Sequence, residues 1–351
     1  MDIAVDGSRA LVASNQFGLS EIIGLDSNIA SVAASASVES VSNVPFAGTQ
    51  IALSDNAAVV TGQKDGMAHL WVLDVSETLP QPTVTGELSS SIPANQGSTG
   101  FLDVTAGTIG SRSYAFVAAG TSGVKIVDIT DPRYPSLTAT YATANAYGVA
   151  FESARSLLYV ADTSAGLQIV NVSSPGRPLL VGSFKLAGAI YRDIEVSTGM
   201  AYLADQSGTI TVVDVTLASA PRFVSRATLL GFGLYIAVDG NTKRAAVVSK
   251  TSTVSAQYEN LEIFDISGTT PRRIASRGSA LETPSGTFMG VALANGSVYT
   301  AGGKGVQIYQ ADNLSIDPEK VAVAGSAADI SVTSTYAYVA GYPAILSIML
   351  P

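Results

Sequence analysis

Four aspartates recur at the same position of a short pattern in which apolar residues alternate with small or polar ones. They are the first residues of DIAV, DVTA, DIEV and DISV, namely Asp2, Asp103, Asp193 and Asp329. Carboxylates brought within about 4–8 Å of one another repel unless they are protonated, hydrogen-bonded or bridged by a cation. A fold that gathers these four segments therefore has to neutralise this charge or use it.

Two interpretations of the four aspartates are open. In the first, they hold a structural cation such as Ca²⁺, or they bind a cationic or polyhydroxylated ligand. In the second, each carboxylate accepts backbone N–H groups from the neighbouring structural unit and fixes the angle between units. We favour the second interpretation, and we expect no cofactor beyond such a Ca²⁺ ion.

A set of aromatic and basic residues lies just before or at the same pattern. Its members are Tyr191, Arg192, Tyr235 and Phe288, with Phe232 close by. Exposed aromatic rings beside an arginine are typical of carbohydrate and peptide sites. These residues are therefore our candidates for ligand binding, although the same residue types also close the end of a packed core.

Most metal-, thiol- and triad-based chemistries are excluded by composition. The 351 residues contain no cysteine and one histidine, His69, which lies in the strand-like segment HLWVLDV beside Trp71. A Ser-His-Asp triad would have to use that histidine, and no GxSxG motif accompanies it. We predict no catalytic residue and a packing role for His69.

The segments are parts of a larger repeat. Val124–Leu137 reads VKIVDITDPRYPSL, and Leu167–Leu180 reads LQIVNVSSPGRPLL. Further copies begin at Leu70, Ile210 and Leu261, and weaker ones lie near both ends of the chain. The copies follow one another at about 40–50 residues, a spacing typical of a four-stranded propeller blade. Alternation with period two, broken by Gly and Pro, predicts strands and turns throughout.

The two sharpest copies, KIVDITDPRYPSL and QIVNVSSPGRPLL, resemble the LVIVD-repeat family. This resemblance implies an all-β propeller on the surface of a prokaryotic cell, and it implies little about activity because propellers host many unrelated functions. We predict one domain over residues 1–351, with eight blades of three to four antiparallel strands. Seven blades, with the first and last units sharing one, is the alternative. The predicted blades are 1–45, 46–98, 99–143, 144–187, 188–230, 231–280, 281–325 and 326–351.

Unit one is predicted to have a complete strand set that ends near Ile29–Val38. Unit eight shows three strands, and we expect it to lack an outer strand or to take one from residues beyond this sequence. An open strand edge of this kind could accept a strand from a neighbour, which favours self-assembly or strand exchange.

The aspartate of the VDI core is predicted to be structural. Asp74, Asp128, Asp214 and Asp265 precede turns rich in Asp, Ser and Pro, where a short carboxylate bonds the backbone two residues on. Asp162 and Asp205 precede glycine-containing hairpin turns that lack the alternating carboxylates of a Ca²⁺ loop. Two polar stretches, Ser90–Gly100 and Lys250–Asn260, are expected to protrude as loops that present a recognition surface.

Charge and hydrophobicity limit the partners. The net charge is −9, and the 19 Lys and Arg residues are scattered, so a footprint for nucleic acid is missing. No apolar run approaches the ~18–20 residues that cross a bilayer, which predicts no membrane insertion. An acidic, Lys-poor and Cys-free chain without a visible signal peptide fits an exported protein whose signal has been removed.

The sequence thus predicts a non-enzymatic, extracellular or cell-surface propeller that binds protein or glycan or acts as a structural assembly module. The alternative is an enzyme with carboxylates at the channel mouth. One form would be a glycan-active enzyme that uses two of Asp103, Asp193 and Asp329. The other would be a metal-dependent, lactonase-like hydrolase that uses Glu195 and Asn145.

Overall fold

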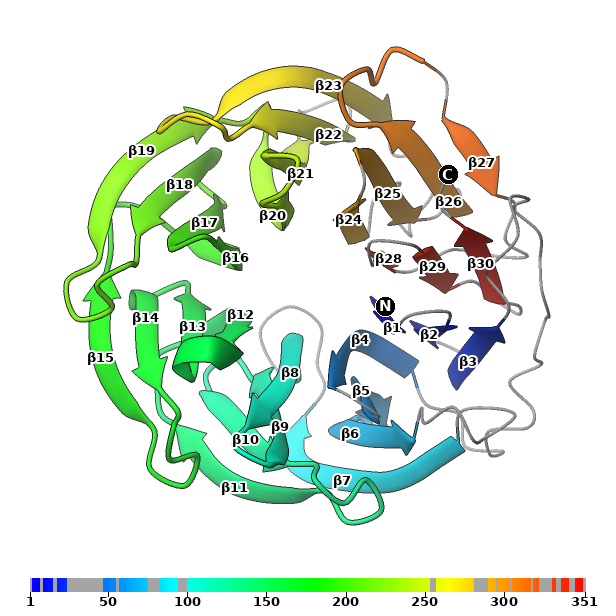
Figure 1. The fold of residues 1–351 in the computed structure, drawn as a ribbon, viewed down its shortest axis with the longest axis vertical. Coiled ribbons are helices and arrows are strands. Elements are labelled where there is room, and N and C mark those ends of the chain that lie inside the picture. The colour runs from blue at the N-terminus through cyan, green and yellow to red at the C-terminus, as the bar shows by residue number, and fades with distance from the viewer. Residues whose placement is uncertain are drawn as a thin grey trace.

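Short β-strands joined by tight turns make up nearly all of the computed structural model. It describes residues 2–6, 9–14, 18–23, 47–54, 57–74, 83–93, 100–252, 257–280, 290–294, 296–302, 305–316, 318–321, 330–332, 336–340 and 345–349. Within these residues, the strands form eight antiparallel sheets, each built from strands that follow one another in the chain. The sheets surround a central axis as blades, with the first strand of each blade on the inside (Figure 1). The prediction of an eight-bladed all-β propeller is confirmed.

The strands of blades 1 to 4 are β1 (Asp2–Asp6), β2 (Arg9–Ser14) and β3 (Gly18–Ile23); β4 (Ala47–Ser54), β5 (Ala57–Lys64), β6 (Met67–Asp74) and β7 (Thr83–Pro93); β8 (Asp103–Ile109), β9 (Arg112–Ala118), β10 (Val124–Asp128) and β11 (Ser136–Tyr141); and β12 (Ala146–Glu152), β13 (Leu157–Asp162), β14 (Gly166–Asn171) and β15 (Leu179–Phe184). A 3₁₀ turn, η2 (Ser153–Arg155), joins β12 to β13.

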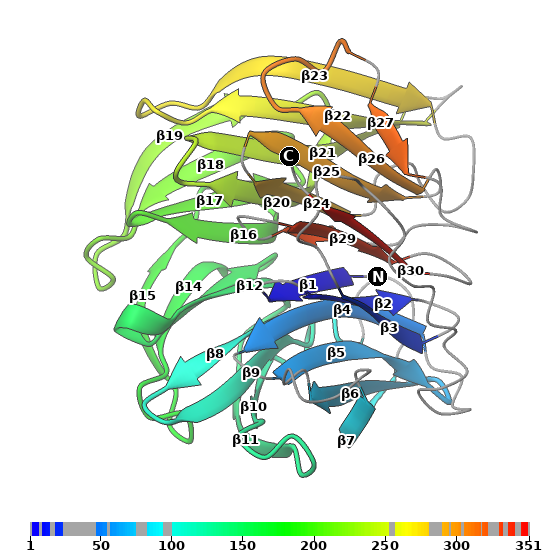
Figure 2. The ribbon, with the colours of Figure 1, turned by 45° about the vertical axis from the view of Figure 1, so that its right-hand side comes forward.

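The strands of blades 5 to 8 are β16 (Tyr191–Ser197), β17 (Met200–Asp205), β18 (Thr209–Asp214) and β19 (Arg222–Thr228); β20 (Phe232–Asp239), β21 (Arg244–Ser252), β22 (Gln257–Asp265) and β23 (Arg272–Ala280); β24 (Gly290–Ala294), β25 (Ser297–Gly302), β26 (Gly305–Gln310) and β27 (Glu319–Val321); and β28 (Ile330–Val332), β29 (Tyr336–Ala340) and β30 (Ile345–Met349). Blade 1 contacts both blade 2 and blade 8, so the ring closes between the first and last blades (Figure 2). The outer strand predicted near Ile29–Val38 lies outside the described residues.

The hydrophobic core is divided among the junctions between blades. In β13, Leu158 and Val160 pack toward blade 3, whereas Leu157, Tyr159 and Ala161 pack toward blade 5. Successive side chains of a strand point to opposite faces, and both faces of a blade are covered by neighbours. This arrangement explains why the second and third strands are apolar at nearly every position rather than at every other one.

A β-bulge recurs where the outer strand pairs with the third strand. The register shifts at Val72/Leu73, Ile126/Val127, Ile169/Val170, Val212/Val213 and Ile263/Phe264, which is the same place in five consecutive blades. The outer-strand residue that follows each shift is small in every case: Gly86, Ala139, Gly182, Ser225 and Ala275. A repeated bulge followed by a small residue indicates a common structural requirement at the rim.

That requirement is contact with the next blade. The turn of blade 5 lies against β15 so closely that a Cβ atom on Gly182 would overlap the carbonyl oxygen of Ala218, and Gly86 meets Pro132 of blade 3 in the same way. Thr85 donates a hydrogen bond of 3.2 Å to the Pro132 carbonyl, and Ser225 donates one of 2.6 Å to the Thr269 carbonyl of blade 6. We call this contact the rim latch.

Both stretches expected to be loops contain strand residues, and the expectation of a loop is wrong for these parts. Residues 250–252 belong to β21 and residues 257–260 to β22, where Lys250 pairs with Glu259 and Ser252 with Gln257. Glu259 and Asn260 are buried. Residues 90–93 belong to β7 and pair with β6. Polar composition suggested loops, but cross-strand pairing satisfies the backbone hydrogen bonds of the strand residues in both segments. Residues 94–99 and 253–256 lie outside the described residues.

Candidate functional site

The first strands of blades 2 to 7 line a central cavity of about 770 Å³. Its walls carry the carboxylates Asp103, Glu152, Asp193 and Glu195, the guanidinium of Arg192, and the rings of Tyr147 and Tyr235. This volume is in the range of small-molecule sites, which is about 300–1,000 Å³. The cavity therefore contains two of the four predicted ring aspartates and two of the four predicted ligand-binding residues.

Asp103 and Asp193 connect neighbouring blades. One oxygen of Asp103 accepts the N–H of Val104 at 2.8 Å, and the other accepts the N–H of Val149 in blade 4 at 2.7 Å. Asp193 repeats the arrangement with Ile194 and with Ile236 of blade 6, both at 2.8 Å. We call this pair of hydrogen bonds the hub clamp. It is the backbone-accepting role that the sequence favoured for these aspartates.

The other two ring aspartates are not described in the same detail. Asp2 begins β1, but its side chain lies outside the described residues, as does Asp329. Among the side chains that the structure describes, no three His, Cys, Asp or Glu residues are grouped to hold a metal ion. Both oxygens of Asp103 and both oxygens of Asp193 accept backbone N–H groups.

The candidate ligand-binding residues separate into different environments. The guanidinium carbon of Arg192 lies 3.9 Å from the centroid of the Tyr147 ring, a close cation–π contact at the cavity wall. Tyr235 also lines the cavity and is exposed. Tyr191, by contrast, is fully buried in the core between blades 4 and 5, so it belongs to the core rather than to the cavity. Phe288 lies outside the described residues.

Glu195 is the exceptional residue of the cavity. At its position, two residues after the hub position, the first strands of blades 2, 3, 4, 6 and 7 have Ala52, Thr105, Ala150, Ala237 and Ala292. The Glu195 side chain is half-buried and lines the cavity wall. This burial, together with the charge of Asp193, raises the pKa of Glu195 to about 8.

Glu152 forms a compact polar cluster at the end of β12. Arg155 donates two hydrogen bonds to its carboxylate, at 2.8 and 2.7 Å, and the Tyr159 hydroxyl donates another at 2.8 Å. The Arg155 hydrogen bonds lower the pKa of Glu152 in spite of its partial burial. Glu152 is therefore held in an ion pair with Arg155. The sequence did not indicate this role because the partners of Glu152 are specific to blade 4.

The turn aspartates have the structural roles that were predicted. Thr130, Thr216 and Ser267 donate their backbone N–H to the aspartate two residues earlier, at 2.9 Å in each case. Asp162 and Asp205 are fully buried and accept backbone N–H groups within their hairpin turns and from the segment before the first strand. The side chain of Asp74 lies outside the described residues.

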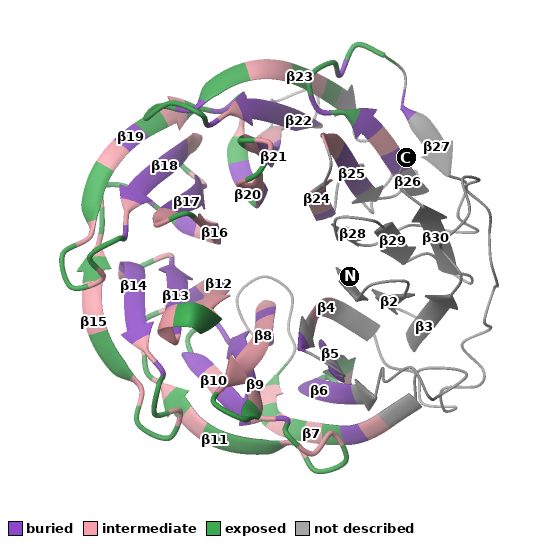
Figure 3. Cartoon of the chain, in the orientation of Figure 1, coloured by how far each residue is buried: buried purple, intermediate pink, exposed green. Residues whose placement is uncertain are grey.

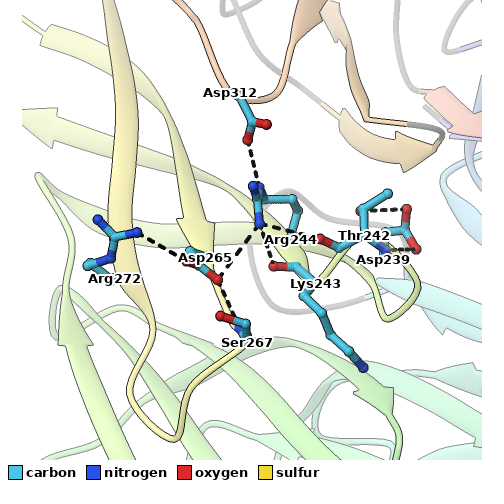
Figure 4. A network of polar contacts seen from close by, with 8 residues as sticks. All are labelled: Asp239, Thr242, Lys243, Arg244, Asp265, Ser267, Arg272 and Asp312. Atoms are coloured by element: carbon cyan, nitrogen blue, oxygen red, sulfur yellow. Dashed lines mark hydrogen bonds and ion pairs between the residues drawn. The ribbon is translucent and has the colours of Figure 1, made fainter.

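A polar network between blades 6 and 7 surrounds Arg244 (Figure 4). Arg244 donates to Asp312 of blade 7 at 2.8 Å, lies 3.7 Å from Asp265, and donates to the carbonyls of Thr242 and Lys243. Hydrogen bonds from Ser267 and Arg272 hold the pKa of Asp265 at about 2. The contact between Arg244 and Asp312 therefore joins blade 6 to blade 7.

His69 has a packing role, as predicted. It is buried in β6, its ring stacks on Trp71 with centroids 5.5 Å apart, and its Nδ1 lies 2.7 Å from a Glu87 oxygen. Lys64 binds the same carboxylate at 3.1 Å. These side chains lie on β5, β6 and β7, away from the first strands that line the cavity.

Comparison with known proteins identifies the repeat. Four segments match the sequence model of the LVIVD repeat: residues 111–143, 157–185, 190–228 and 324–348. The chain carries LVIVD repeats. Three of the LVIVD segments lie in blades 3, 4 and 5, and each contains the third strand, the VDI turn and the outer strand. The resemblance seen in the sequence is confirmed.

Solved structures with this architecture are distant in sequence. BamB from Moraxella catarrhalis superposes with a TM-score of 0.62 at 14% identity, covering 99% of this chain and 96% of that chain. Raptor from Chaetomium thermophilum gives 0.62 at 11% identity, with 84% of this chain matched to 27% of that one. A functionally unknown protein from Desulfotomaculum acetoxidans gives 0.59 at 13%, covering 90% and 93%. At these identities, the likeness shows the fold alone.

Two further comparisons bear on function. A search of curated protein sequences finds no match. In the part of the chain that the structure describes, there is no helix with the length and apolar character needed to cross a membrane. A propeller of LVIVD repeats is a scaffold that supports protein interaction in general, and its specific role has to be argued from its surface.

Proposed function

We propose that this protein is a non-enzymatic interaction module that works outside the cell or on its surface and binds a partner protein through the outer rim of its LVIVD blades. One observation carries the proposal: large apolar side chains are exposed at the same place in three consecutive blades. That place is the VDI turn with the first residues of the outer strand, residues 130–137, 173–180 and 216–223, which we call the outer corners.

The outer corners expose side chains that a core would normally bury. Leu137, Leu180 and Phe223 occupy the same register position of their outer strands and are 53%, 45% and 47% exposed. Tyr134, Leu179 and Leu217 of the same corners are 74%, 67% and 57% exposed. The outer strands β11, β15 and β19 form the outside of the ring, where exposed and half-buried residues alternate (Figure 3). Scattered exposed apolar residues need no explanation, but repetition at one structural position indicates a binding surface.

Charge indicates the kind of partner. Exposed arginines stand beside the apolar residues at each corner: Arg133, Arg177 and Arg222. Arg133 is paired with Asp131 of its own turn at 2.9 Å, and Arg222 interacts electrostatically with Asp214 on the neighbouring strand, whereas Arg177 has no ion pair among the described contacts. An apolar protein surface that carries acidic groups complements this rim.

An extracellular site of action is supported by composition. The chain has no cysteine, is acidic, and contains 13% charged residues. Localisation is tested by treating intact source cells with a protease and detecting the protein before and after. Loss of the protein from intact cells supports the proposal, and survival until the cells are lysed contradicts it.

The rim is tested with two matched pairs of substitutions. The rim variant is Leu179→Glu with Phe223→Glu, and the control is Ser183→Glu with Thr228→Glu, which adds equal charge to exposed positions on the same two strands. We expect a protein captured from the source envelope, and then purified, to bind wild type and control but to bind the rim variant at least tenfold more weakly. Equal binding by all three proteins would overturn the proposal, and so would binding lost equally in the control.

Glycan binding at the channel mouth and self-assembly are the other interaction modes to separate. Tyr235 and the Arg192–Tyr147 pair support the first, and the exposed edges of the outer strands support the second. A glycan array answers the first question. Light scattering over a range of protein concentrations answers the second, since a concentration-dependent mass is expected for self-assembly.

A hydrolytic enzyme is the second candidate, and Glu195 is the observation that favours it. A carboxyl group that keeps its proton near pH 7 and faces a cavity has the property required of a general acid. The test is turnover of chromogenic glycosides and lactones by wild type and by Glu195→Gln. We expect no turnover by either protein, and turnover lost on the substitution would favour the enzyme.

A further inference from the structure

Glu195 is placed where a carboxyl group is costly and structurally unnecessary. Five described blades have alanine or threonine at this position, and their first strands pair normally with their second strands. The described bond to the Glu195 carboxyl is the N–H of Val196, the next residue in its own strand. A half-buried carboxyl that lines the cavity and that strand pairing does not require indicates a role toward something that enters the cavity.

The other charged groups of the cavity are already engaged. On β8 and β16, Asp103 and Asp193 accept backbone N–H groups from two blades each. On β12, Glu152 holds Arg155 and Tyr159. Arg192 lies over Tyr147. Two other titratable groups have to be considered with Glu195. Tyr202 of β17 is the cross-strand partner of Glu195, and Tyr235 of β20 lines the same cavity.

We propose that the central cavity binds an alkylammonium group, with Glu195 as its counter-charge and the rings of Tyr147 and Tyr235 beside its alkyl chain. Glu152 is paired with Arg155, so once Glu195 is ionised the cavity wall carries Asp103, Asp193 and Glu195 against the guanidinium of Arg192, and a ligand with positive charge is favoured over an anion. The volume of about 770 Å³ suits a small organic molecule or one long side chain.

A bare metal ion fits this cavity less well. Among the described side chains, no three carboxylate or imidazole groups are gathered for coordination. Hard cations need about six oxygen ligands, and Glu195 stands alone in a layer of small residues. A primary ammonium group needs only three hydrogen-bond acceptors, which a carboxylate, a backbone carbonyl and water can provide.

Binding is coupled to a proton. The free protein holds Glu195 protonated at neutral pH, and an ammonium ligand binds the ionised carboxylate. The carboxyl proton is therefore released to solvent when the ligand binds. The apparent affinity for the ligand then rises about tenfold per pH unit up to the pKa of the free carboxyl, and it levels off above that pH. The ligand does not change this dependence, because a lysine-like amine stays charged to about pH 10.

The experiment is isothermal titration of the full chain with two amines and one neutral analogue. The amines are 1,4-diaminobutane and Nα-acetyl-lysine amide, and the analogue is 1,4-butanediol. Titrations run from pH 6 to pH 9, and at pH 6.5 they are repeated in two buffers of different ionisation enthalpy to count protons. We expect binding of at least one amine, no binding of the diol, and release of about one proton per ligand at pH 6.5.

Three variants decide the role of Glu195. Glu195→Gln keeps the shape of the side chain and removes its charge. Glu195→Ala introduces the small residue that other blades have at this position. Two variants are used so that the test still stands if one of them fails to fold. Asp312→Asn is the matched control, because it removes an exposed carboxylate outside the cavity. We expect both Glu195 variants to lose at least tenfold in affinity and the control to match wild type.

The two amines separate the sources of the ammonium group. Binding of diaminobutane alone identifies a free diamine, and binding of the lysine compound alone identifies a lysine side chain of a partner. Binding of neither amine at millimolar concentration overturns the proposal. It is equally overturned if Glu195→Gln binds as wild type does, or if affinity is independent of pH between 6 and 8.

Discussion

At the residue scale, two neighbouring carboxyl groups on one strand have different roles. Asp193 accepts backbone N–H groups from blades 5 and 6, whereas Glu195, two residues later, is half-buried, and its pKa is raised to about 8. The raised pKa of Glu195 follows from burial and from the charge of Asp193, which together outweigh the hydrogen bond that its carboxyl accepts from the N–H of Val196. The sequence shows both residues, but it does not show which of them receives the donors.

Glu195 makes stability depend on pH. Its pKa is raised from 4.5 in the unfolded chain to about 8 in the fold, so the folded state holds the extra proton between these values. The stability that this proton confers is fully present below about pH 4.5 and is lost as the pH rises to about 8, with a slope of about 1.4 kcal/mol per pH unit. We expect this slope to be present in wild type and missing in Glu195→Gln.

The measurement is urea unfolding of both proteins at several pH values from 5 to 9. The difference in unfolding free energy between the two proteins isolates residue 195 from the other carboxylates. A difference that stays constant over this range would contradict the raised pKa.

Asp193→Ala should weaken the hub clamp. It leaves the N–H groups of Ile194 and Ile236 without their acceptor, and hydrogen bonds to a charged group are worth about 1.5–3 kcal/mol each. We expect the unfolding free energy to fall by about 2–4 kcal/mol, with Asp312→Asn nearly unchanged as a control. Unchanged stability in the alanine variant would show that the clamp is dispensable.

At the element scale, the outer strand is shaped by its neighbour. The repeated bulge and the small residue after it allow the next VDI turn to lie against the strand. The strands, their order and the turn aspartates could be predicted because alternation and Asp-Pro turns are local signals. The rim latch could not, since the requirement for Gly182 comes from Ala218 of the next blade rather than from its own turn.

Gly182→Val tests the rim latch. The added side chain overlaps the Ala218 carbonyl, and overpacking of this kind costs typically about 1–3 kcal/mol. Ser183→Val is the control, because it is exposed and adds a β-branched residue to the same strand. We expect urea denaturation to show a loss for the first variant and little change for the second; equal effects would mean that the close approach is relieved at no cost.

At the scale of the whole molecule, blades are joined at two radii. The hub clamps join blade 3 to blade 4 and blade 5 to blade 6, and rim latches join blades 2 and 3, 4 and 5, and 5 and 6. Blade number and ring closure could be predicted by counting VDI copies, because a closed propeller leaves every blade face covered. The channel contents could not, because Tyr147 and Arg192 meet only after blades 4 and 5 pack together.

Metal removal should leave the ring intact. Since Asp103 and Asp193 already accept backbone N–H groups through both oxygens, we expect the same melting temperature in EDTA and in added Ca²⁺. The measurement is thermal unfolding of the dialysed protein under both conditions. An upward shift with Ca²⁺ would indicate a site bound only by the folded state and would return the ring aspartates to a metal-binding role.

The rim latch has an evolutionary consequence. Each repeat encodes a turn that makes the contact and a small residue that receives it. In the structure, Ala218 of blade 5 meets Gly182 of blade 4, and Pro132 of blade 3 meets Gly86 of blade 2. A duplicated repeat therefore arrives with both halves of the contact and fits between existing neighbours without compensating substitutions. Propellers built from this unit can gain or lose a blade by unequal recombination, with ring closure rather than blade compatibility setting the permitted number.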